Sequence, residues 1–225
     1  MRMLAILALM VALSHVPANA AWAPNRGPQT EFLACGHREC LYGGAAGGGK
    51  SDGLLIAAVI YADCSDCNSV IFRRSYPELR NLIRRSLELY PSIGGVYNRA
   101  QHEWRFPSGA AVIFRFIASE SDVYAYQGDA FTFIGWDELT QFPGDHTDEE
   151  TGETYNSAYV YMFSRLRRLA GSRIRLMVRA TCNPGGVGHH WVKARFKIDD
   201  AGNATVVKDP RTGLHRSFIP ARINH

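Results

Sequence analysis

Residues 43–51 of the sequence are Gly43-Gly44-Ala45-Ala46-Gly47-Gly48-Gly49-Lys50-Ser51, and the last eight of them fit the pattern G-x-x-x-x-G-K-S. Glycine adopts positive φ at little cost, so five glycines and two alanines allow this backbone to curl. In such a loop, successive N–H groups point inward and bind phosphate oxygens. A helix that begins near Lys50 would add its positive end. The pattern therefore predicts a loop that binds the phosphates of a nucleotide.

Both flanks of this loop are apolar, as a strand–loop–helix unit requires. Cys40-Leu41-Tyr42 is compatible with a buried strand, and residues 54–61 are compatible with a helix buried against a sheet. A glycine-rich linker that matches by chance would lack these flanks. We expect Lys50 to reach the β- and γ-phosphates and Ser51 to hold Mg²⁺. The predicted phosphate-binding residues are Gly44, Ala45, Ala46, Gly47, Gly48, Gly49, Lys50 and Ser51.

A second apolar run, residues 131–136, ends in two adjacent acids, Asp137 and Glu138. Its composition is typical of a strand covered on both faces, and ligands bind at the C-terminal ends of strands in open α/β sheets. We predict that Asp137 holds Mg²⁺ opposite Ser51 and that Glu138 polarises the attacking water. Because a kinase needs no water-activating glutamate, the pair favours a hydrolase. The alternative is an Asp-Glu pair that only caps a helix.

Two more polar residues are candidates for the same site. Asn183, after a third apolar strand, would fall beside the strand with the acids and hydrogen-bond the γ-phosphate or the attacking water. The alternative is a common Asn-Pro-Gly turn. Gln29 has an amide that both donates and accepts, as recognition of the adenine edge requires. On spacing alone, an ordinary polar surface residue is the favoured interpretation of Gln29.

The remaining chain alternates strands with helices, which predicts a mostly parallel α/β sheet. Residues 144–156 carry five acids and no Lys or Arg, so they indicate a solvated loop. Ser75-Tyr76-Pro77-Glu78 predicts a capping box at a helix start. The expected helices are 28–34, about 76–90, 159–169 and 187–197, with a short helix or loop at 118–126. The expected strands are 69–73, a hairpin of 102–106 with 110–117, 175–181 and a strand near 216–219.

Composition allows one large domain. An apolar fraction of 46% in 225 residues supports a sizeable core, and a net charge of +4 permits a nucleic-acid partner without requiring one. We expect a domain over 25–225 and an apolar extension over 1–24. Residues 1–20 are similar to a secretory signal, and their apolar run is too short to span a bilayer. Because an ATP-dependent domain needs cytosolic ATP, a cytoplasmic location is favoured over export.

The five cysteines do not indicate a disulfide framework, because their number is odd. Cys64-Ser65-Asp66-Cys67 is a C-x-x-C pair, but zinc would need two more ligands. The nearest pair, Cys35 and Cys40, flanks the strand before the phosphate loop, where a closed metal site would be awkward. We therefore expect reduced thiols.

Five arginines form a basic cluster around the second predicted helix. They would contact phosphates of DNA or the ATP of a neighbouring subunit, and a solvated helix face is the equal alternative. The cluster consists of Arg73, Arg74, Arg80, Arg84 and Arg85.

As a set, these segments resemble the ATPase domain of viral and phage terminase large subunits. The resemblance covers about residues 25–222. Residues 27–33 resemble the adenine-contacting glutamine motif of the family, 41–51 its Walker A motif, 134–142 its Walker B motif and 181–184 its coupling motif. Further similar segments are 71–80, 126–128 and 188–196.

The resemblance implies a P-loop NTPase (RecA/ASCE-like) three-layer fold with a mostly parallel central sheet. In that family a ring of subunits hydrolyses ATP with Mg²⁺ and drives double-stranded DNA into a preformed capsid. The implied partners are double-stranded DNA, the portal protein and the terminase small subunit. The implied roles are Lys50 and Ser51 on phosphate and Mg²⁺, Asp137 on Mg²⁺, Glu138 as catalytic base, Asn183 in coupling and Gln29 on adenine.

The sequence departs from the family in two respects. The family usually continues into an RNase H-like nuclease domain, whereas this sequence ends at His225, so we expect no DNA cleavage by this polypeptide. The family also uses a trans-acting arginine often placed before Walker B, but residues 119–130 contain none; Arg73, Arg74 or Arg80 could replace it. The competing hypotheses are another RecA-like or helicase-like DNA-dependent ATPase and an exported non-enzymatic protein.

Overall fold

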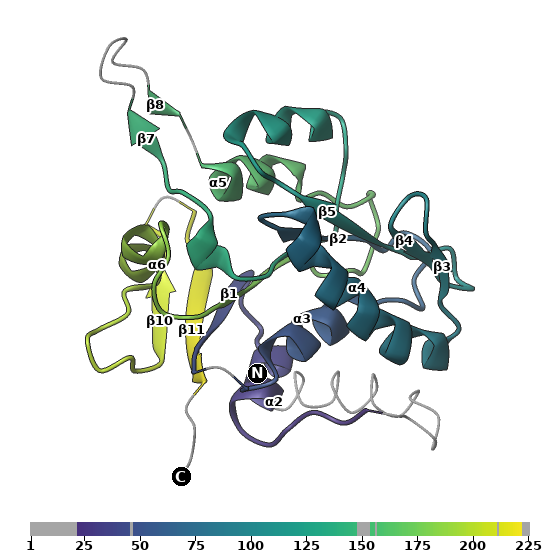
Figure 1. Ribbon diagram of the computed structural model, residues 1–225, viewed down its shortest axis with the longest axis horizontal. Helices are drawn as coiled ribbons and strands as arrows, with labels where there is room; N and C mark the ends of the chain where they lie inside the picture. Colours follow the sequence, from purple (N-terminus) through teal and green to yellow (C-terminus); the bar gives the residue numbers. More distant parts are fainter. Residues whose placement is uncertain (1–21, 46, 148–153, 156, 211, 222–225) are drawn as a thin grey trace.

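The computed structural model describes residues 22–45, 47–147, 154–155, 157–210 and 212–221. Within these residues the chain builds a nine-stranded sheet in the order β10-β11-β1-β9-β6-β2-β5-β4-β3 (Figure 1). Its strands are β1 (Glu39–Gly44), β2 (Asn68–Arg73), β3 (Val96–Asn98), β4 (Glu103–Arg105), β5 (Ala111–Phe116), β6 (Phe133–Trp136), β9 (Met177–Cys182), β10 (Thr205–Lys208) and β11 (His215–Ala221). A separate ribbon pairs β7 (His146–Thr147) with β8 (Thr154–Tyr155).

Along the chain, a helix or 3₁₀ helix lies between each pair of successive parallel strands. The α-helices are α2 (Pro28–Ala34), α3 (Lys50–Ala58), α4 (Tyr76–Leu89), α5 (Ala158–Met162) and α6 (His189–Phe196). Short 3₁₀ helices are η1 (Tyr90–Ile93), η2 (Glu120–Tyr126), η3 (Leu139–Gln141) and η4 (Phe163–Arg165).

The centre of the sheet is parallel and its two margins are antiparallel. Strands β11, β1, β9, β6, β2 and β5 run in one direction, whereas β10, β4 and β3 pair antiparallel. This confirms the mostly parallel α/β sheet. Strand β9 lies between β1 and β6, with Gly43 opposite Cys182 and Trp136 opposite Ala180. The ends of these three strands therefore meet at one edge of the sheet.

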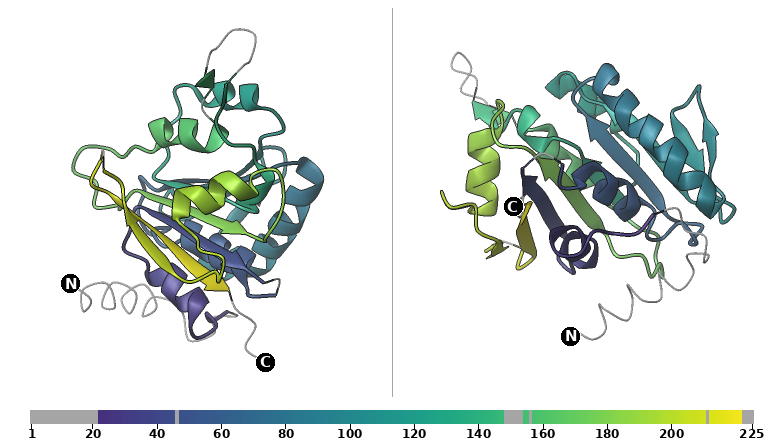
Figure 2. Two further views of the ribbon diagram at one scale, coloured as in Figure 1. Left: turned by 90° about the vertical axis from the view of Figure 1, so that its left-hand side faces the viewer. Right: turned by 60° about the horizontal axis from the view of Figure 1, so that its bottom comes forward.

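Helices cover both faces of the sheet, so the molecule has three layers (Figure 2). Two separate hydrophobic clusters correspond to the two faces. One joins the sheet to α2, α3 and α4, through residues such as Phe32, Leu54 and Leu79. The other joins it to η2, α5 and α6, through residues such as Tyr159 and Val192. Each fully buried large apolar side chain contributes about 1.5–3 kcal/mol.

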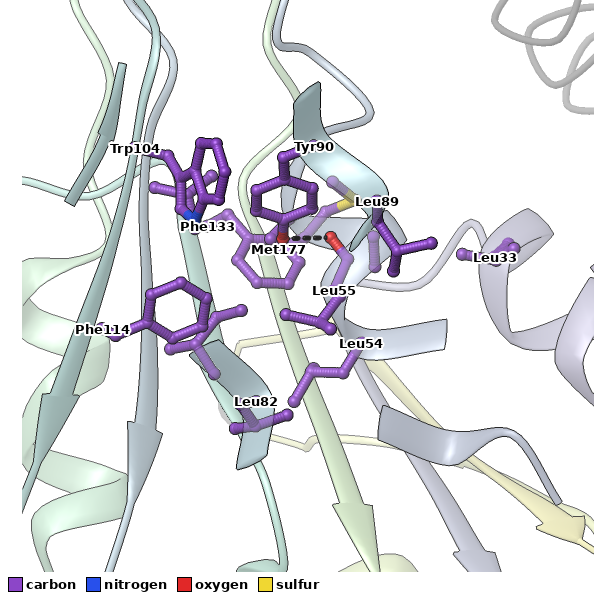
Figure 3. Packing of buried hydrophobic residues seen from close by; sticks show 14 of the residues in the cluster. Leu33, Leu54, Leu55, Leu82, Leu89, Tyr90, Trp104, Phe114, Phe133 and Met177 are labelled. Carbon is purple, nitrogen blue, oxygen red and sulfur yellow. Dashed lines mark hydrogen bonds between the residues drawn. The ribbon is translucent and has the colours of Figure 1, made fainter. Parts of the chain in front are cut away.

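The first cluster fixes α3 and α4 against the sheet (Figure 3). Tyr90 follows α4 and is fully buried, and its hydroxyl donates to the carbonyl oxygen of Leu55 on α3 at 2.7 Å. Trp104 packs edge-on against Tyr90, with ring centroids 5.3 Å apart, and its Nε1–H donates to Ser86 on α4. The large rings of Tyr90 and Trp104 can be buried at low cost because their polar atoms are hydrogen-bonded. The helix that follows the glycine-rich loop is therefore tied to α4 by a buried hydrogen bond.

One predicted helix is shorter than its sequence suggested. The prediction of a helix over 159–169 is wrong beyond α5 and the 3₁₀ turn η4. Leu166 is extended and pairs with Phe131, with hydrogen bonds from Phe131 N to Arg165 O (2.9 Å) and from Arg167 N to Phe131 O (2.8 Å). Pairing with a distant segment overrides the helical pattern, because it satisfies the same backbone groups.

Local predictions differ from the structure at three other places. Ser75 is the N-cap of α4, but its side chain makes no cap hydrogen bond and donates instead to Glu78 Oε2 at 2.9 Å. Residues 144–156, expected as a loop, contain the two short strands β7 and β8. Strands β3 and β10 were not predicted, since short edge strands carry little periodic signal.

Among the described residues, no helix has the length and apolar character needed to cross a membrane. The signal-like segment and its cleavage pattern fall within residues 1–21, outside the described part of the chain.

Candidate nucleotide-binding site

The glycine-rich loop connects β1 to α3, as the strand–loop–helix prediction required. Gly44 has φ 124°, Gly47 has φ 82°, and Gly49, the N-cap of α3, has φ 66°. These positive values favour glycine over any residue with a Cβ atom. No side chain caps α3, so its first N–H groups are available to an anion. Ala46 lies outside the described residues.

Close approach to neighbouring strands explains two of the glycines. A Cβ on Gly43 would lie 2.5 Å from Cys182 Sγ, and a Cβ on Gly44 would lie 2.5 Å from the carbonyl oxygen of Ala221. Ala45 N donates to that same oxygen at 3.0 Å. The loop is therefore seated on the ends of β9 and β11, and its curvature is set before any ligand binds.

Lys50 is buried at the start of α3, and its ammonium group is turned back onto the loop. Nζ donates to the carbonyl oxygens of Ala45 (2.5 Å) and Gly44 (3.3 Å). Burial lowers the pKa of Lys50, while the nearby Glu138 and Asp137 act in the opposite direction. The amine thus already occupies the inside of the loop, where phosphate oxygens would be better partners than neutral carbonyls.

Asp137 follows β6 and lies against the phosphate loop. Ser51 Oγ donates to Asp137 Oδ1 at 3.2 Å, and Thr181 Oγ1 donates to the same oxygen at 2.7 Å. The Asp137 side chain is 1% exposed. The structure therefore brings together Ser51 and Asp137, which the sequence predicted would hold Mg²⁺.

Glu138 is held in an unusual backbone conformation next to Asp137. Its φ of 56° and ψ of 57° are left-handed, which a non-glycine residue rarely adopts. Both carboxylate oxygens accept from Asn183, one from the backbone N–H (3.0 Å) and one from Nδ2 (2.5 Å). Burial and the adjacent Asp137 charge raise the pKa of Glu138, although Arg73, Asn183 and Lys50 counter the shift. Strain at such a position commonly marks a functional group.

Gln29 lies on α2 and is 1% exposed, so it is not an ordinary surface residue. Its Nε2 donates to the carbonyl oxygen of Gly49 at 2.6 Å, and its Oε1 accepts from Asn25 N at 2.6 Å. The Gln29 amide therefore links α2 to Gly49, at the end of the glycine-rich loop. The predicted contact with adenine stays a prediction, and it would require one of these two bonds to be exchanged.

Two buried polar atoms of the site, Arg73 Nη1 and Asn183 Oδ1, have no hydrogen-bond partner among the described residues, and Arg73 Nε and Asp137 Oδ2 face each other at 2.8 Å without an aligned hydrogen bond. Buried polar atoms are nearly always satisfied, so their gathering here fits a polar ligand. Within the described residues no group of three His, Cys, Asp or Glu side chains could hold a metal. Mg²⁺ takes few protein ligands and completes its shell with phosphate and water. Ser51 and Asp137 fit such an ion.

Two residues reach Asp137 through contacts that the sequence did not predict. Thr181 donates to Asp137 and also accepts from Glu138 N at 3.1 Å. Arg73 ends β2, and its Nε lies 2.8 Å from Asp137 Oδ2. The sequence predicted that the strand before Asn183 lies beside the acids but gave Thr181 no contact there, and it did not place β2 beside β6.

The predicted basic cluster is not one surface. Arg73 faces Asp137, Arg74 Nη1 donates to Ile117 O at 3.0 Å, and Arg85 binds Asp52 through two nitrogens. Arg80 and Arg84 are exposed on α4. The cysteines are all free thiols, as expected.

No protein-family model matches the sequence, and no curated protein matches it. Solved structures do match. The large terminase of a thermophilic bacteriophage matches with a TM-score of 0.57 and 18% identity over 80% of this chain and 44% of that one. The ATPase domain of the Thermus phage P74-26 large terminase matches with a TM-score of 0.56 and 14% identity over 89% and 81%. The N-terminal domain of the phi29 DNA packaging ATPase matches with a TM-score of 0.56 and 13% identity over 86% and 94%.

The chain shares its fold with phage packaging ATPase domains. This confirms the P-loop fold that the sequence resemblance implied. The likeness at these identities concerns the fold alone, and this chain spans less than half of the large terminase from the thermophilic bacteriophage. That terminase also matches in structures with ADP (TM-score 0.54) and with ATP-γ-S (TM-score 0.52).

Proposed function

We propose that this chain hydrolyses ATP as the motor domain of a terminase large subunit that packages double-stranded DNA. The observation that carries the proposal is the 3.2 Å contact between Ser51 and Asp137. It joins a phosphate loop to a pair of acids from a strand that is not adjacent to it in the sheet. A chance glycine-rich loop has no reason to meet such a pair.

Each residue of the site has a chemical task in this proposal. Lys50 binds the β- and γ-phosphates, and the loop amides from Gly44 to Ser51 cradle them. Ser51 and Asp137 would hold Mg²⁺, which neutralises the charge that develops on the phosphates. Glu138 orients and deprotonates the attacking water. Asn183 keeps the Glu138 carboxylate in place through its two hydrogen bonds.

The raised pKa of Glu138 supports its assignment as the base. A general base works best when its pKa lies near the operating pH. Burial and the Asp137 charge move the pKa of Glu138 in that direction. By contrast, Asp137 has a cation beside it and hydroxyl donors on Oδ1, so its carboxylate suits a metal.

The first experiment compares ATP turnover of the wild type with that of Glu138→Gln. We expect the variant to bind nucleotide as the wild type does and to lose turnover by about 10²–10⁴-fold, the usual contribution of a general base. Because burial already disfavours the charged form, removal of the charge should not unfold the protein. Glu88→Gln, at a side chain 58% exposed on α4, is the matched control and should turn over normally. Wild-type turnover in Glu138→Gln would reject Glu138 as the base.

The packaging role rests on the shared fold and on the sequence resemblance, and it needs its own test. A packaging motor is expected to show ATPase activity that increases when capsids with portal protein and double-stranded DNA are present. A RecA-like or helicase-like ATPase would respond to DNA alone. ATPase activity that increases with DNA but does not change when portal protein is added would therefore favour the RecA-like or helicase-like ATPase.

The proposed cytoplasmic location is tested by N-terminal sequencing of the recovered protein. An intact chain in the cytoplasmic fraction supports an ATP-dependent motor. A mature protein that starts at Ala21 in the periplasm or medium would favour the exported protein.

A further inference from the structure

Arg73 is a cation of the site to which the proposed reaction assigns no task. It is the last residue of β2, and β2 pairs with β6 so that Phe72 lies opposite Trp136. Asp137 N donates to Phe72 O at 3.0 Å, which continues the pairing beyond the strand. This register places the guanidinium beside the two acids. Arg73 is thus positioned by the sheet itself and not by a mobile loop.

The contact of Arg73 with Asp137 is incomplete as a structural ion pair. Nε lies 2.8 Å from Asp137 Oδ2, yet neither atom makes an aligned hydrogen bond, and Nη1 is also buried without a partner. An arginine that serves only to neutralise a carboxylate usually binds it with two parallel N–H groups. Arg85 does so with Asp52, through Nε at 2.8 Å and Nη2 at 2.6 Å. Arg73 therefore has donors that remain available for another anion.

The two cations of the site share one property. Lys50 donates to carbonyl oxygens of its own loop, and Arg73 lies against the carboxylate that would hold Mg²⁺. Both partners are ones that a bound nucleotide would replace, since phosphate is a better acceptor for either cation. If Asp137 held a divalent ion, the charge of that ion would weaken the attraction between Asp137 and the Arg73 guanidinium, which lies 2.8 Å from Oδ2. A phosphate oxygen would then be the better partner for Arg73.

We propose that Arg73 binds the terminal phosphate of ATP in the same subunit, exchanging the Asp137 carboxylate for a γ-phosphate oxygen when the nucleotide binds. The inference rests on the proposed function, because it requires ATP in the phosphate loop. It makes Arg73 a sensor of the γ-phosphate. ADP lacks that group, so Arg73 stays with Asp137 in the ADP state.

The test is nucleotide affinity, measured without turnover. Fluorescently labelled ATP-γ-S and ADP are titrated into the wild type and Arg73→Ala, each with Mg²⁺ and with EDTA. The wild type is expected to prefer ATP-γ-S, and in Arg73→Ala that preference should fall by about tenfold, the value of one charge-assisted bond to phosphate. The fall should persist in EDTA, because the proposed bond goes to phosphate and not to the metal.

A purely structural role gives a different result. If Arg73 only neutralises Asp137, both nucleotides change in affinity by the same factor and the ratio stays at the wild-type value, which overturns the proposal. The proposal would also be overturned if Arg73→Ala lowered the preference for ATP-γ-S over ADP in the presence of Mg²⁺ but left it unchanged in EDTA. Arg73 would then act on the metal through Asp137.

Two further variants complete the experiment. Arg115→Ala is the matched control, because the Arg115 guanidinium donates to the carbonyl oxygens of Gln101 and Phe114 and not to the acids; its ratio should equal that of the wild type. Arg73→Lys keeps the charge and replaces Arg73→Ala if that variant does not fold; it should retain part of the preference. Failure of the wild type to bind either nucleotide would reject the proposed function itself, whereas binding with an unchanged ratio would reject only the role of Arg73.

Discussion

At the scale of single residues, one hydroxyl group organises both acids of the site. Thr181 Oγ1 donates to Asp137 Oδ1 at 2.7 Å and accepts from Glu138 N at 3.1 Å. Thr181 is fully buried, so water cannot replace either bond. The hydroxyl therefore sets the orientation of Asp137 and the backbone of Glu138 at the same time. A shift in this one group would displace both carboxylates.

Thr181→Val tests this arrangement. Valine has a similar shape but lacks the hydroxyl, so the Glu138 N–H is left buried without an acceptor. We expect a loss of about 1–3 kcal/mol in the free energy of unfolding, measured by urea denaturation, and a lower turnover at saturating ATP. Thr181→Ser keeps the hydroxyl and should recover turnover. Equal turnover in both variants would show that the hydroxyl does not position the acids.

The rate of ATP turnover should depend on the protonation state of Glu138. Burial and the Asp137 charge raise its pKa, so the folded protein holds this proton more tightly than an ordinary glutamate does. The proposed base is deprotonated only above the raised pKa, and turnover should fall as the pH is lowered through it. We expect the acidic limb of a plot of turnover against pH to lie above the usual glutamate range. Nucleotide affinity measured over the same range identifies any loss due to binding. A limb at the ordinary glutamate pKa would contradict the prediction.

At the scale of elements, the strand–loop–helix unit depends on close contact with its neighbours. At Gly43, β1 lies in close contact with β9. A Cβ added there would lie 2.5 Å from Cys182 Sγ and 3.0 Å from Phe218 Cε2. The loop can reach its position only if this residue has no side chain. Its glycine is therefore required by packing, whereas Gly44 and Gly49 are also required by their positive φ.

Gly43→Ala is expected to move the phosphate loop away from β9. The overpacking should cost about 1–3 kcal/mol of unfolding free energy, and nucleotide affinity should fall because the loop amides no longer converge. Gly53→Ala is the control on α3, where an added Cβ would lie 3.4 Å from Phe32 Cδ1, an ordinary contact. Alanine favours the helix there by about 0.5–1 kcal/mol. If Gly43→Ala binds nucleotide like Gly53→Ala, the packing argument fails.

At the scale of the whole molecule, a buried ion pair joins elements far apart in the sequence. Glu39 begins β1 and is 5% exposed. It accepts from Arg195 on α6 (2.6 and 3.0 Å) and from the hydroxyl of Tyr159 on α5 (2.9 Å). The Arg195 guanidinium also lies over the Tyr159 ring at 5.2 Å. A cavity of about 280 Å³ is lined in part by Glu39, Arg195 and Arg216, so this end of β1 carries its own polar network.

Glu39→Gln should be among the most destabilising single changes in the chain. It removes one partner of a buried pair and leaves Arg195 uncompensated, which typically costs about 3–5 kcal/mol. Glu88→Gln removes the exposed partner of Arg85 and should change the unfolding free energy by less than about 1 kcal/mol. Urea denaturation of both variants measures the contrast. Similar unfolding free energies for Glu39→Gln and Glu88→Gln would mean that the Glu39–Arg195 pair does not stabilise the packing of α6 on the sheet.

The sequence alone determined the parts of the site that belong to continuous segments. The loop from Gly44 to Ser51, the strand before Asp137 and the strand before Asn183 each have a local pattern of glycine or apolar residues that specifies them. The parallel sheet followed from the alternation of these strands with helices. Short edge strands and the end of α5 were not determined in this way, because pairing with distant segments outweighs local preference there.

Only the tertiary structure decided which side chains meet. Strand order places β9 and β2 on either side of β6, which brings Thr181 and Arg73 to Asp137; the sequence predicted only that the strand before Asn183 lies beside the acids. The tertiary structure likewise places Gln29 next to the loop, where its amide donates to Gly49 O and accepts from Asn25 N. The physical reason is that a residue at the end of a buried strand has its position fixed by the strands beside it. Its neighbours are therefore set by sheet pairing and burial, and not by its distance along the chain.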